Sequence, residues 1–533
     1  MTRGAAPPDR RPGTQVDVAI VGAGPVGLLL AILLGQRGWR VQVVERHPHP
    51  YDLPRAVHMD DETARVLQGA GVMEALRGLC EPMDAYEWRN AKGEVLLALS
   101  GGTGTAGWPS SLMFCQADLQ NALLQRAKMC HTVELLWDWE LYSLDAGNGA
   151  KGSDLSVNIA SGNPFVRTVN AKWVVGCDGA NSSVRRLTDT SVEDLGLSHR
   201  WVVADFLTPG QPRWAPLNLQ ICDPARPTTA VSGGRGRRRF EFLCLPDEDL
   251  AAMATPETVW DLAKQWGLPA SGSVLERVAG YRFCAQVAKK WRAGPGGRVL
   301  LAGDAAHQMP PFAGQGLCAG VRDVANLAWK LDLVLAGRAG EDLLDTYEAE
   351  RAPLAREEVG LSVALGQIVC VTDSAAAAER DAAMVPVATE SGPIPIPEQP
   401  SLPPVLANSG FAHAGRVGIQ APVGRNGDGV GMADDVLGGL RWALLSPHGN
   451  PCDYLPPQLR SWWEVLGGAG AQIAPGADLD DTTGAYAQWF SELVSAVVLV
   501  RPDYRLYGAV AGLGDTPKLV EALRGALDKA SLP

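Results

Sequence analysis

The sequence predicts a multidomain α/β protein, and three observations support this class. The chain has 533 residues, more than one hydrophobic core normally holds, so about two to four domains are expected. Residues 16–45 show the strand, turn, helix and strand of a βαβ unit. Residues 133–175 then change to three short β-rich runs separated by turn residues, as in an antiparallel meander. Parallel and antiparallel strands are therefore both expected.

The composition fits a globular protein that acts on small molecules. Hydrophobic residues make up 46% of the chain and charged residues 20%, which excludes disorder throughout. The net charge is -12 and lysines and arginines form no long run, so neither nucleic acid nor an anionic membrane is an expected partner. Residues 1–14 lack an apolar signal segment, and no stretch is long enough to span a membrane. We expect a cytoplasmic protein with a disordered N-terminus.

The first element with a chemical signature is the turn Gly22-Ala-Gly-Pro-Val-Gly27. It follows a strand at residues 16–21 and opens an apolar helix at residues 25–36, and the next strand ends on Glu45. Without side chains, the glycines let backbone N–H groups approach a pyrophosphate at the positive end of the helix, and the glutamate can accept from ribose hydroxyls. This combination predicts a Rossmann-like dinucleotide-binding unit.

Two later turns place an acidic residue at the end of an apolar strand. Asp178 lies in Gly176-Cys-Asp-Gly-Ala-Asn-Ser-Ser-Val-Arg185, and Asp304 follows the run at residues 299–302. A carboxylate at the carboxyl end of such a strand can accept from a ligand hydroxyl, because ligands bind at that edge of open α/β sheets. Gly314 and Gly316 precede a predicted helix at residues 316–335 and can offer N–H groups to an anionic ring or phosphate.

The other elements indicate two further folding units. Residues 190–287 mix strand-like runs with one helix at residues 256–265, which predicts a mixed-sheet domain. A helix at residues 342–371 is followed by seven prolines between positions 386 and 404, which predict an extended linker. Beyond it, strands at residues 441–445 and 496–500 and a helix at residues 516–529 predict a small α/β domain.

The three turns, in this order and spacing, resemble those of the FAD-dependent aromatic hydroxylases, the single-component class A flavoprotein monooxygenases. The resemblance covers residues 15–370 and is strongest to the 3-(3-hydroxyphenyl)propionate hydroxylase branch. Four further stretches carry it: Pro54-Arg-Ala-Val-His-Met-Asp60, Gln116-Ala-Asp-Leu-Gln120, Arg238-Arg-Phe-Glu-Phe242 and Arg322-Asp-Val-Ala-Asn-Leu-Ala-Trp-Lys330.

The resemblance implies a Rossmann-like FAD-binding domain with an inserted mixed-sheet substrate domain and a C-terminal thioredoxin-like domain. Only Cys452 remains in the last domain, so we expect a structural or association role for it and not dithiol exchange. The implied division is an FAD-binding domain at residues 15–83, 112–189 and 288–372, a substrate domain at 84–111 and 190–287, a Pro-rich linker at 373–404 and the thioredoxin-like domain at 405–533.

The resemblance also implies which residues contact FAD. Gln116 has the alternative role of a strand-end cap, and Pro311 that of stiffening its loop. The expected FAD-binding residues are Gly22, Gly24, Pro25, Gly27, Glu45, Arg46, Arg55, Gln116, Asp178, Gly303, Asp304, Pro311, Gly314, Gly316 and Leu317.

In such enzymes NADH or NADPH reduces FAD, and a flavin C4a-hydroperoxide formed with O2 hydroxylates a phenol ortho to its hydroxyl group. The implied substrate is 3-(3-hydroxyphenyl)propionate or a similar hydroxyaryl carboxylate, and a homodimer is one assembly considered. No metal is expected, since the chemistry needs none and no two of the ten cysteines stand in C-x-x-C spacing.

Catalytic residues are harder to predict, because the cofactor carries the difficult chemistry. His307 could relay protons or fix its loop, and the two alternatives stay open. Tyr281 could bond a phenol, and Arg238 or Arg239 could hold a substrate carboxylate, but each could equally be part of an ordinary strand surface.

Three other functions are compatible with the same motifs. The enzyme could hydroxylate a polyketide or another phenolic natural product, or it could be an FAD oxidoreductase without oxygen insertion. A non-catalytic flavin-containing interaction or sensor protein is the alternative from another class. The choice between NADH and NADPH stays open, because the sequence has no second Rossmann motif.

Overall fold

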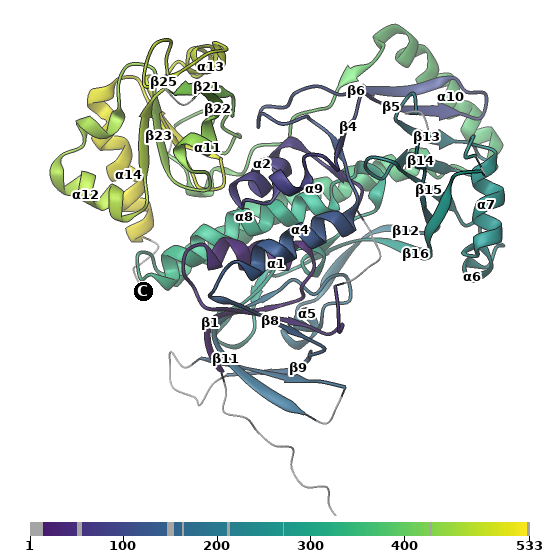
Figure 1. The fold of residues 1–533 in the computed structure, drawn as a ribbon, viewed down its shortest axis with the longest axis horizontal. Coiled ribbons are helices and arrows are strands. Elements are labelled where there is room, and N and C mark those ends of the chain that lie inside the picture. Colours follow the sequence, from purple (N-terminus) through teal and green to yellow (C-terminus); the bar gives the residue numbers. More distant parts are fainter. Residues whose placement is uncertain are drawn as a thin grey trace, which may run out of the picture.

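The computed structural model describes residues 14–50, 56–146, 154–162, 165–210, 214–269, 271–408, 410–425 and 429–529. The expected disordered segment at residues 1–14 therefore lies almost entirely outside the described residues. Figure 1 shows a central group of helices, α1, α4, α8 and α9, between one sheet that contains β1 and β11 and two other β-rich units.

The first sheet has eight strands and a parallel centre. Its main path runs β17-β18-β11-β1-β2-β8, and β9 and β10 extend it as an antiparallel meander from β11. The strands are β1 (Thr14–Val21), β2 (Val41–Glu45), β8 (Val133–Trp137), β9 (Glu140–Asp145), β10 (Leu155–Ala160), β11 (Val166–Gly176), β17 (Arg292–Ala293) and β18 (Val299–Leu301). The predicted three-run meander was wrong in one respect: the region holds four strands, and the first, β8, pairs in parallel with β2. The intervening helix α4 returns the chain in the direction that a parallel strand requires.

Three helices pack together on this sheet: α1 (Pro25–Gly35), α4 (Gln116–Lys128) and α8 (Gly316–Leu335). Every residue of α1 from Gly27 to Leu34 is buried, because the helix lies between the sheet and its two neighbours. The helices predicted at residues 25–36 and 316–335 are confirmed to within one residue.

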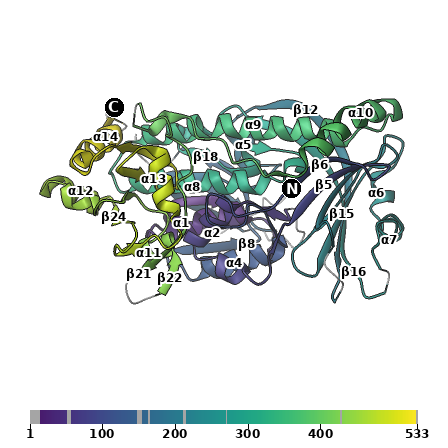
Figure 2. The ribbon, with the colours of Figure 1, turned by 90° about the horizontal axis from the view of Figure 1, so that it is seen from above.

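The second sheet has nine strands and includes most strands of the predicted substrate domain, so we call it the substrate sheet. Its order is β19-β16-β12-β15-β14-β13-β5-β6-β20, and α6 (Leu250–Met253) and α7 (Pro256–Lys264) cover one face. The strands are β5 (Ala85–Asn90), β6 (Val95–Ser100), β12 (Val192–Leu207), β13 (Asn218–Cys222), β14 (Thr228–Ser232), β15 (Arg237–Leu243), β16 (Val274–Ala288), β19 (His307–Gln308) and β20 (Ile394–Pro395). Figure 2 shows this sheet at the opposite end of the molecule from the C-terminal unit.

A small three-stranded sheet lies between these units. It has the order β3-β7-β4, formed by β3 (His58–Met59), β7 (Leu112–Met113) and β4 (Glu81–Pro82). The helices α2 (Asp61–Gly69) and α3 (Met73–Leu76) follow β3, and a short α5 (Ser183–Leu187) follows β11.

The structure corrects the prediction of a Pro-rich linker at residues 373–404. Its first half forms helix α10 (Ser374–Ser391), directly after α9 (Asp345–Val369), and Pro386 lies inside α10. Asp373 caps the helix by accepting from the Ala376 N–H (2.8 Å), and the alanine-rich run favours helix strongly enough to accommodate one proline. The next residues form β20, which pairs with β6 and so joins the substrate sheet.

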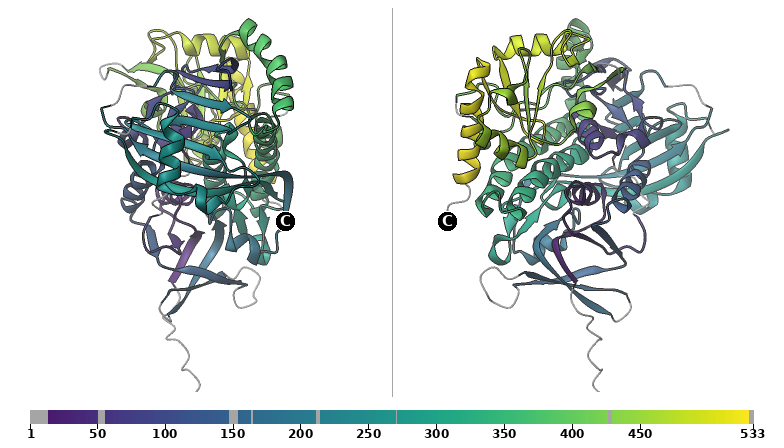
Figure 3. Two further views of the ribbon diagram at one scale, coloured as in Figure 1. Left: turned by 90° about the vertical axis from the view of Figure 1, so that its right-hand side faces the viewer. Right: turned by 60° about the vertical axis from the view of Figure 1, so that its left-hand side comes forward.

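The C-terminal unit contains a four-stranded mixed sheet in the order β24-β23-β26-β27 and a smaller sheet in the order β22-β21-β25. Its elements are β21 (Pro422–Arg425), β22 (Gly429–Met432), α11 (Ala433–Leu437), β23 (Ala443–Ser446), α12 (Pro457–Val465), β24 (Ala469–Gln472), β25 (Leu479–Asp480), α13 (Ala485–Leu493), β26 (Val497–Val500), β27 (Leu506–Val510) and α14 (Thr516–Lys529). Trp442 of this unit packs edge-on against Trp329 of α8, with ring centroids 5.2 Å apart. Figure 3 shows the unit, coloured light green to yellow, beside the long helices.

No single helix within the described ranges is both long enough and apolar enough to cross a membrane. The segments Glu341–Val369 and Ser374–Ser391 meet the length and composition limits only as a pair, and they are bent by 112° relative to each other.

Candidate active site

Three strands end at the same level of the parallel sheet. Val21 of β1 pairs with Gly176 of β11, and Gly176 in turn pairs with Leu301 of β18. The turns that follow these residues are the three motifs identified from the sequence. Because the strands are parallel and in register, the turns lie side by side at one edge of the sheet, where ligands bind in open α/β folds.

The first turn is closely packed on its inner side and open on its outer side. Gly22 has φ +104°, and a Cβ there would lie 2.4 Å from the Cys177 carbonyl oxygen. A Cβ on Gly27 would lie 2.0 Å from the Gly22 carbonyl oxygen, whereas one on Gly24 would have no neighbour within 4 Å. The helix α1 starts at Pro25 without a capping side chain, so its first N–H groups face this open side. The turn therefore fits a pyrophosphate.

Two polar side chains hold this turn in place. Glu45 accepts from the N–H of Ala23 (2.8 Å) and from that of His47 (3.0 Å), which ties the end of β2 to the turn. Gln120 of α4 donates to the Ala23 carbonyl (2.6 Å) and is almost fully buried. We did not predict Gln120 as a site residue, although it stands in a stretch that carries the family resemblance.

The second turn uses its aspartate locally. Asp178 accepts from the N–H groups of Ser183 (2.6 Å) and Val184 (3.1 Å), so its carboxylate caps α5. Burial raises the pKa of Asp178 above the ordinary value for an aspartate. Arg185, at the end of the same motif, donates to the Ala305 carbonyl (2.8 Å) and so joins the second turn to the third.

The third turn presents Asp304. It forms the 3-10 helix η2 (Gly303–Ala305), in which Asp304 is half-buried between two buried residues. Gly303 has φ +61°, and a Cβ there would lie 3.2 Å from Val26 of α1, so the third turn packs directly on the start of the first helix. Asp304 is thus placed beside the N-terminal end of α1.

The loop that follows leads into α8. It contains the 3-10 helix η3 (Pro311–Ala313), and Gly314 has φ +65°. The His58 ring donates from Nδ1 to the Gly314 carbonyl (3.1 Å), which joins β3 to the loop. The helix α8 begins at Gly316, again without a capping side chain, so Gly316 and Leu317 lie at a positive helix end.

The remaining predicted cofactor residues lie apart from these turns or cannot be placed. Arg46 is exposed, and its Nε lies 3.4 Å from His47 Nε2. Gln116 begins α4 and accepts from the Ala56 N–H (2.6 Å), so it holds the segment that follows Arg55. Arg55 itself lies outside the described residues.

Comparison with known proteins agrees with this geometry. The family model described as an FAD binding domain matches residues 15–362, and a model described as an HcaD C-terminal domain matches residues 415–526. A probable NADH-specific resorcinol 4-hydroxylase of Rhodococcus jostii (strain RHA1) is 34% identical over 518 residues, covering 96% of this chain and 95% of the relative. A 3-(3-hydroxy-phenyl)propionate/3-hydroxycinnamic acid hydroxylase of Mycolicibacterium smegmatis is also 34% identical, over 538 residues, covering 96% and 93%.

The chain belongs to the FAD-dependent aromatic hydroxylases. It is an FAD-dependent aromatic monooxygenase that uses NAD(P)H. The crystal structure of a ternary complex of aklavinone-11 hydroxylase with FAD and aklavinone matches the hydroxylase with a TM-score of 0.75 at 26% identity, covering 97% of this chain and all of that one. The α/β fold with an FAD-binding domain is thereby confirmed.

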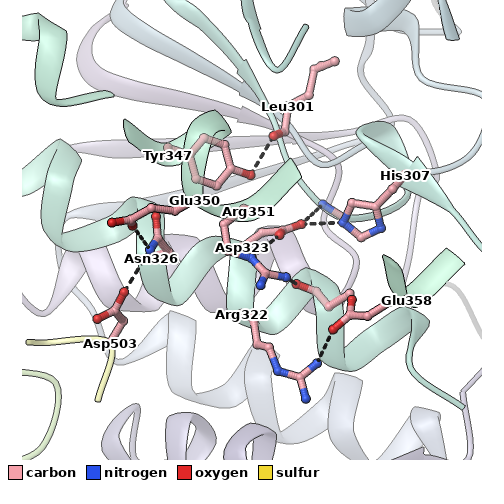
Figure 4. Close-up of polar contacts among 12 residues, drawn as sticks. Leu301, His307, Arg322, Asp323, Asn326, Tyr347, Glu350, Arg351, Glu358 and Asp503 are labelled. Carbon is pink, nitrogen blue, oxygen red and sulfur yellow. Dashed lines mark hydrogen bonds and ion pairs between the residues drawn. The ribbon is translucent and has the colours of Figure 1, made fainter. Parts of the chain in front are cut away.

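His307 of the hydroxylase lies in a closed ion pair. Its Nε2 is 2.7 Å from Asp323 Oδ2, and both side chains are fully buried (Figure 4). Asp323 also accepts from the Gly303 N–H (3.0 Å) and from Arg351 Nε (3.0 Å). Burial opposes a charged imidazole, but the Asp323 carboxylate outweighs it and raises the pKa of His307 above its ordinary value. The pair therefore fixes the third turn to helix α8.

Arg322, the neighbour of Asp323 on α8, has a similar role toward the loop. It donates to Gln315 Oε1 (3.1 Å), to Glu62 Oε2 (3.0 Å) and to Glu358 Oε1 (3.2 Å), and it also contacts Asp60. Gln315 is the residue between Gly314 and Gly316. Two adjacent residues of α8 therefore hold the two ends of the segment predicted to face the flavin.

The structure brings Tyr281 and Arg239 together on one face of the substrate sheet. Arg239 binds Asp205 through Nε (2.7 Å) and Nη2 (3.0 Å), Arg277 contacts the same carboxylate (3.3 Å), and Arg277 also donates to the Tyr281 hydroxyl. His307 is not part of this group, because it pairs with Val287 of β16, about 20 Å along the strand from Tyr281.

Arg238 points to the opposite face, since successive strand residues alternate. It donates to the Leu217 and Ala230 carbonyls, and its guanidinium lies 4.4 Å from the centre of the Trp214 ring. Burial lowers the pKa of Arg238 to about 9, although Glu81 acts in the other direction. Arg238 and Arg239 thus belong to different environments.

A cleft of about 530 Å³ opens at the tip of the β14–β15 hairpin. Trp214 and Leu217 line it together with Arg235 and Arg237. Leu217 packs in the same apolar cluster as Val57, the residue before His58, and His58 bonds the Gly314 loop. Among the described residues, no group of three or more His, Cys, Asp or Glu side chains is arranged to hold a metal ion.

Proposed function

We propose that the hydroxylase acts on a hydroxyaryl carboxylate, with 3-(3-hydroxyphenyl)propionate as the best representative, and hydroxylates it ortho to the phenol. The observation that carries this proposal is the contact between the Gly314 loop and the substrate sheet. Phe312 of the loop packs edge-on against Trp201 of β12, with ring centroids 5.7 Å apart. A flavin beside the loop would therefore face the sheet on which the predicted substrate residues stand.

On the cofactor side, FAD supplies the oxygen-transfer chemistry when bound, and the chain supplies its orientation. We assign the pyrophosphate to the N–H groups of α1 beside Gly24, and a ribityl hydroxyl to Asp304. Pro311, Gly314 and the start of α8 would lie beside the ring system, where a positive helix end favours anionic flavin. Arg55 remains a predicted phosphate partner.

On the substrate side, the cleft supports a carboxylate-bearing phenol. Its volume lies within the range of about 300 to 1,000 Å³ that is usual for small-molecule sites. Trp214 offers an aromatic face and Arg235 can hold a carboxylate, whereas Arg237 already faces Asp118 and Glu276. We assign Tyr281 to positioning, because its hydroxyl accepts from Arg277 on the face opposite Trp214. We assign His307, Arg238 and Arg239 to positioning as well, because each is buried in contacts with its neighbours.

For the C-terminal unit, the topology supports a thioredoxin-like domain with a structural role. The chain order is β23, α12, β24, α13, β26, β27 and α14, and the central strand β23 is parallel to β24 and antiparallel to β26. Burial raises the pKa of Cys452 to about 11, so its thiol stays protonated at neutral pH and is a poor nucleophile. We also propose the domain division predicted from the sequence, with α10 and β20 replacing part of the linker, and a homodimer as one assembly.

The function is tested with purified protein, FAD and a panel of 3-(3-hydroxyphenyl)propionate, 3-hydroxycinnamate, resorcinol and phenol. We expect the two carboxylates to stimulate NAD(P)H consumption most and to yield products heavier by one oxygen atom. Resorcinol is the second candidate, because one 34%-identical relative is named for it. NADH consumption without any oxygenated product would support a reductase and contradict the proposal.

A further inference from the structure

We propose that the C-terminal domain positions the Gly314 loop through a buried chain of polar side chains, Arg505–Glu62–Arg322–Gln315, and thereby sets the affinity of the hydroxylase for FAD. This proposal rests on the FAD contacts assigned to that loop above. It gives a function to a domain that lies away from the three turns and has a single, partly buried thiol, that of Cys452.

The chain of contacts is continuous. Arg505, just before β27, donates to Glu62 Oε2 (2.7 Å), and Arg322 donates to the same oxygen (3.0 Å). Arg322 then reaches Gln315 Oε1 through Nη1 (3.1 Å). The three charged side chains are only 5%, 11% and 5% exposed, so water does little to screen their interactions.

The balance of buried charges explains how Arg505 can affect the position of Gln315. Arg322 faces three carboxylates, those of Asp60, Glu62 and Glu358. Arg505 is the second cation on Glu62. Without Arg505 the three carboxylates would share one guanidinium, and an uncompensated buried carboxylate is costly. The guanidinium would then be drawn toward Glu62 and away from its neutral partner, Gln315.

A cavity of about 20 Å³ lies beside this chain. Arg322 and Arg505 line it, together with Asn326 and Arg351. Two buried polar atoms of the lining, Asn326 Oδ1 and Arg351 Nη1, have no hydrogen-bond partner among the residues that the structure describes. The volume suits about one water molecule, which could accept from Arg351 and donate to Asn326. Arg351 also binds Asp323, so the domain junction touches the supports of both flavin-facing segments.

The test is a pair of matched variants, Arg505→Met and Arg65→Met. Arg65 lines the same cavity and also joins α2 to the C-terminal domain, through a buried two-bond contact with Asp434 (2.6 and 3.0 Å). Its other hydrogen bonds go to the carbonyls of Gly418 and Ile419, and its side chain is not a member of the chain that leads to Gln315. We expect both variants to lower the melting temperature. Only Arg505→Met should also weaken FAD binding, by about 2- to 30-fold in a fluorescence titration of apoprotein, and alter the visible flavin spectrum. Arg505→Lys, which keeps a positive charge beside Glu62, should retain most of the affinity for FAD.

A double-mutant cycle makes the test independent of overall stability. Gln315→Leu alone should weaken FAD binding, and adding Arg505→Met to it should have little further effect, because both changes break the same chain. Fully additive effects, or equal loss of FAD affinity in Arg65→Met and Arg505→Met, would overturn the proposal. If Arg505→Met does not fold, the cycle is measured with Glu62→Gln and Gln315→Leu, since Glu62 is the next member of the same chain. Neither titration uses a phenolic substrate, so the outcome is separate from that of the proposed reaction.

Discussion

Gly24 and Gly27 stand three residues apart in the first turn but do different work. A methyl group on Gly27 would collide with the Gly22 carbonyl, whereas one on Gly24 would meet only open space. We predict that Gly27→Ala lowers the free energy of unfolding of the apoprotein by about 1 to 3 kcal/mol. Gly24→Ala should leave it within about 0.5 kcal/mol but should abolish FAD binding, because the methyl group would enter the open space that we propose for the pyrophosphate.

Urea unfolding of the two apoproteins and a fluorescence titration with FAD separate these effects. Wild-type FAD affinity in the Gly24→Ala variant would show that the pyrophosphate lies elsewhere.

Asp304 is expected to contribute to cofactor binding and little to folding. Replacing it with alanine leaves a ribityl hydroxyl without its acceptor, which costs about 1 to 3 kcal/mol of binding free energy, or roughly 5- to 150-fold in the dissociation constant. The measurement is the flavin-to-protein absorbance ratio of Asp304→Ala after purification and dialysis. Asp178→Ala is the control: it should mainly lower the melting temperature, since Asp178 caps α5. Full flavin occupancy of Asp304→Ala would refute the assignment.

These two aspartates show where prediction from sequence ends at the scale of one residue. Both follow an apolar strand and both are next to a glycine, so the sequence pattern does not distinguish their roles. The difference comes from Ser182, Ser183 and Val184, whose groups reach back to Asp178 and occupy its carboxylate. The turn that contains Asp178 was recognised from the sequence. Whether its carboxylate bonds to neighbouring residues or to a ligand depends on the conformation of helix α5, which follows it.

At the scale of elements, the His307–Asp323 pair gives the fold a pH dependence. The pKa of His307 is raised above the value of about 6.5 that it would have in the unfolded chain. A raised pKa means that the pair's stabilisation is complete below that pH and is lost as the pH rises through the folded-state pKa. The pKa of Asp323 is lowered, since His307 and Arg351 outweigh its burial, so its contribution is lost only at acidic pH.

We therefore predict that the melting temperature of the hydroxylase falls as the pH is raised through the neutral to mildly alkaline range. His307→Gln should lose this component, and the difference between the two proteins should shrink with rising pH. A difference that stays constant from about pH 5 to pH 9 would mean that His307 does not titrate in the folded protein.

The periodicity of apolar residues predicted the long helices. Other elements depend on tertiary contacts that the local sequence does not reveal. The helices α1 and α8 carry glycine or proline at their starts and long apolar runs, and their limits were predicted to within a residue. The helix α10 was missed because Pro386 inside it and the six prolines that follow it outweighed the alanines of its first half. Arg238 and Arg239 must face opposite ways on any strand, but only the substrate sheet shows which of them faces Tyr281.

At the scale of the whole molecule, buried ion pairs join the C-terminal domain to the central helices. Arg501 binds Glu350 of α9 (2.7 and 2.8 Å) and Asp503, and Lys330 of α8 binds Glu350 as well (2.8 Å; Figure 4 shows Glu350 and Asp503). We predict that Arg501→Met lowers the free energy of unfolding by about 3 to 5 kcal/mol, because it leaves buried carboxylates short of one cation.

Urea unfolding of the holoprotein measures this loss. The control is Arg524→Met, which removes an exposed i,i+4 pair with Asp528 and should change stability by no more than about 0.5 kcal/mol. Equal stability of the two variants would show that the Arg501 cluster contributes nothing to domain docking.

These long-range pairs could not be predicted from the sequence. Arg322 and Asp60 are 262 residues apart, and Arg505 and Glu62 are 443 apart, so no local pattern connects them. The stretch from Arg322 to Lys330 was recognised as part of the family resemblance, but its charges are explained only by the partners that the fold brings to them. The three turns at one edge of the parallel sheet were predictable because their glycines and acids act within single turns. The buried ion pairs that support them were not.

The central claim is that the turns after β1, β11 and β18 hold one FAD molecule against the substrate sheet. The most direct measurement is a crystal structure of the hydroxylase with FAD. It should show the pyrophosphate at the start of α1 beside Gly24, a ribityl oxygen within hydrogen-bonding distance of Asp304, and the ring system between the Gly314 loop and the sheet. FAD bound elsewhere, with the three turns facing only solvent, would contradict the account.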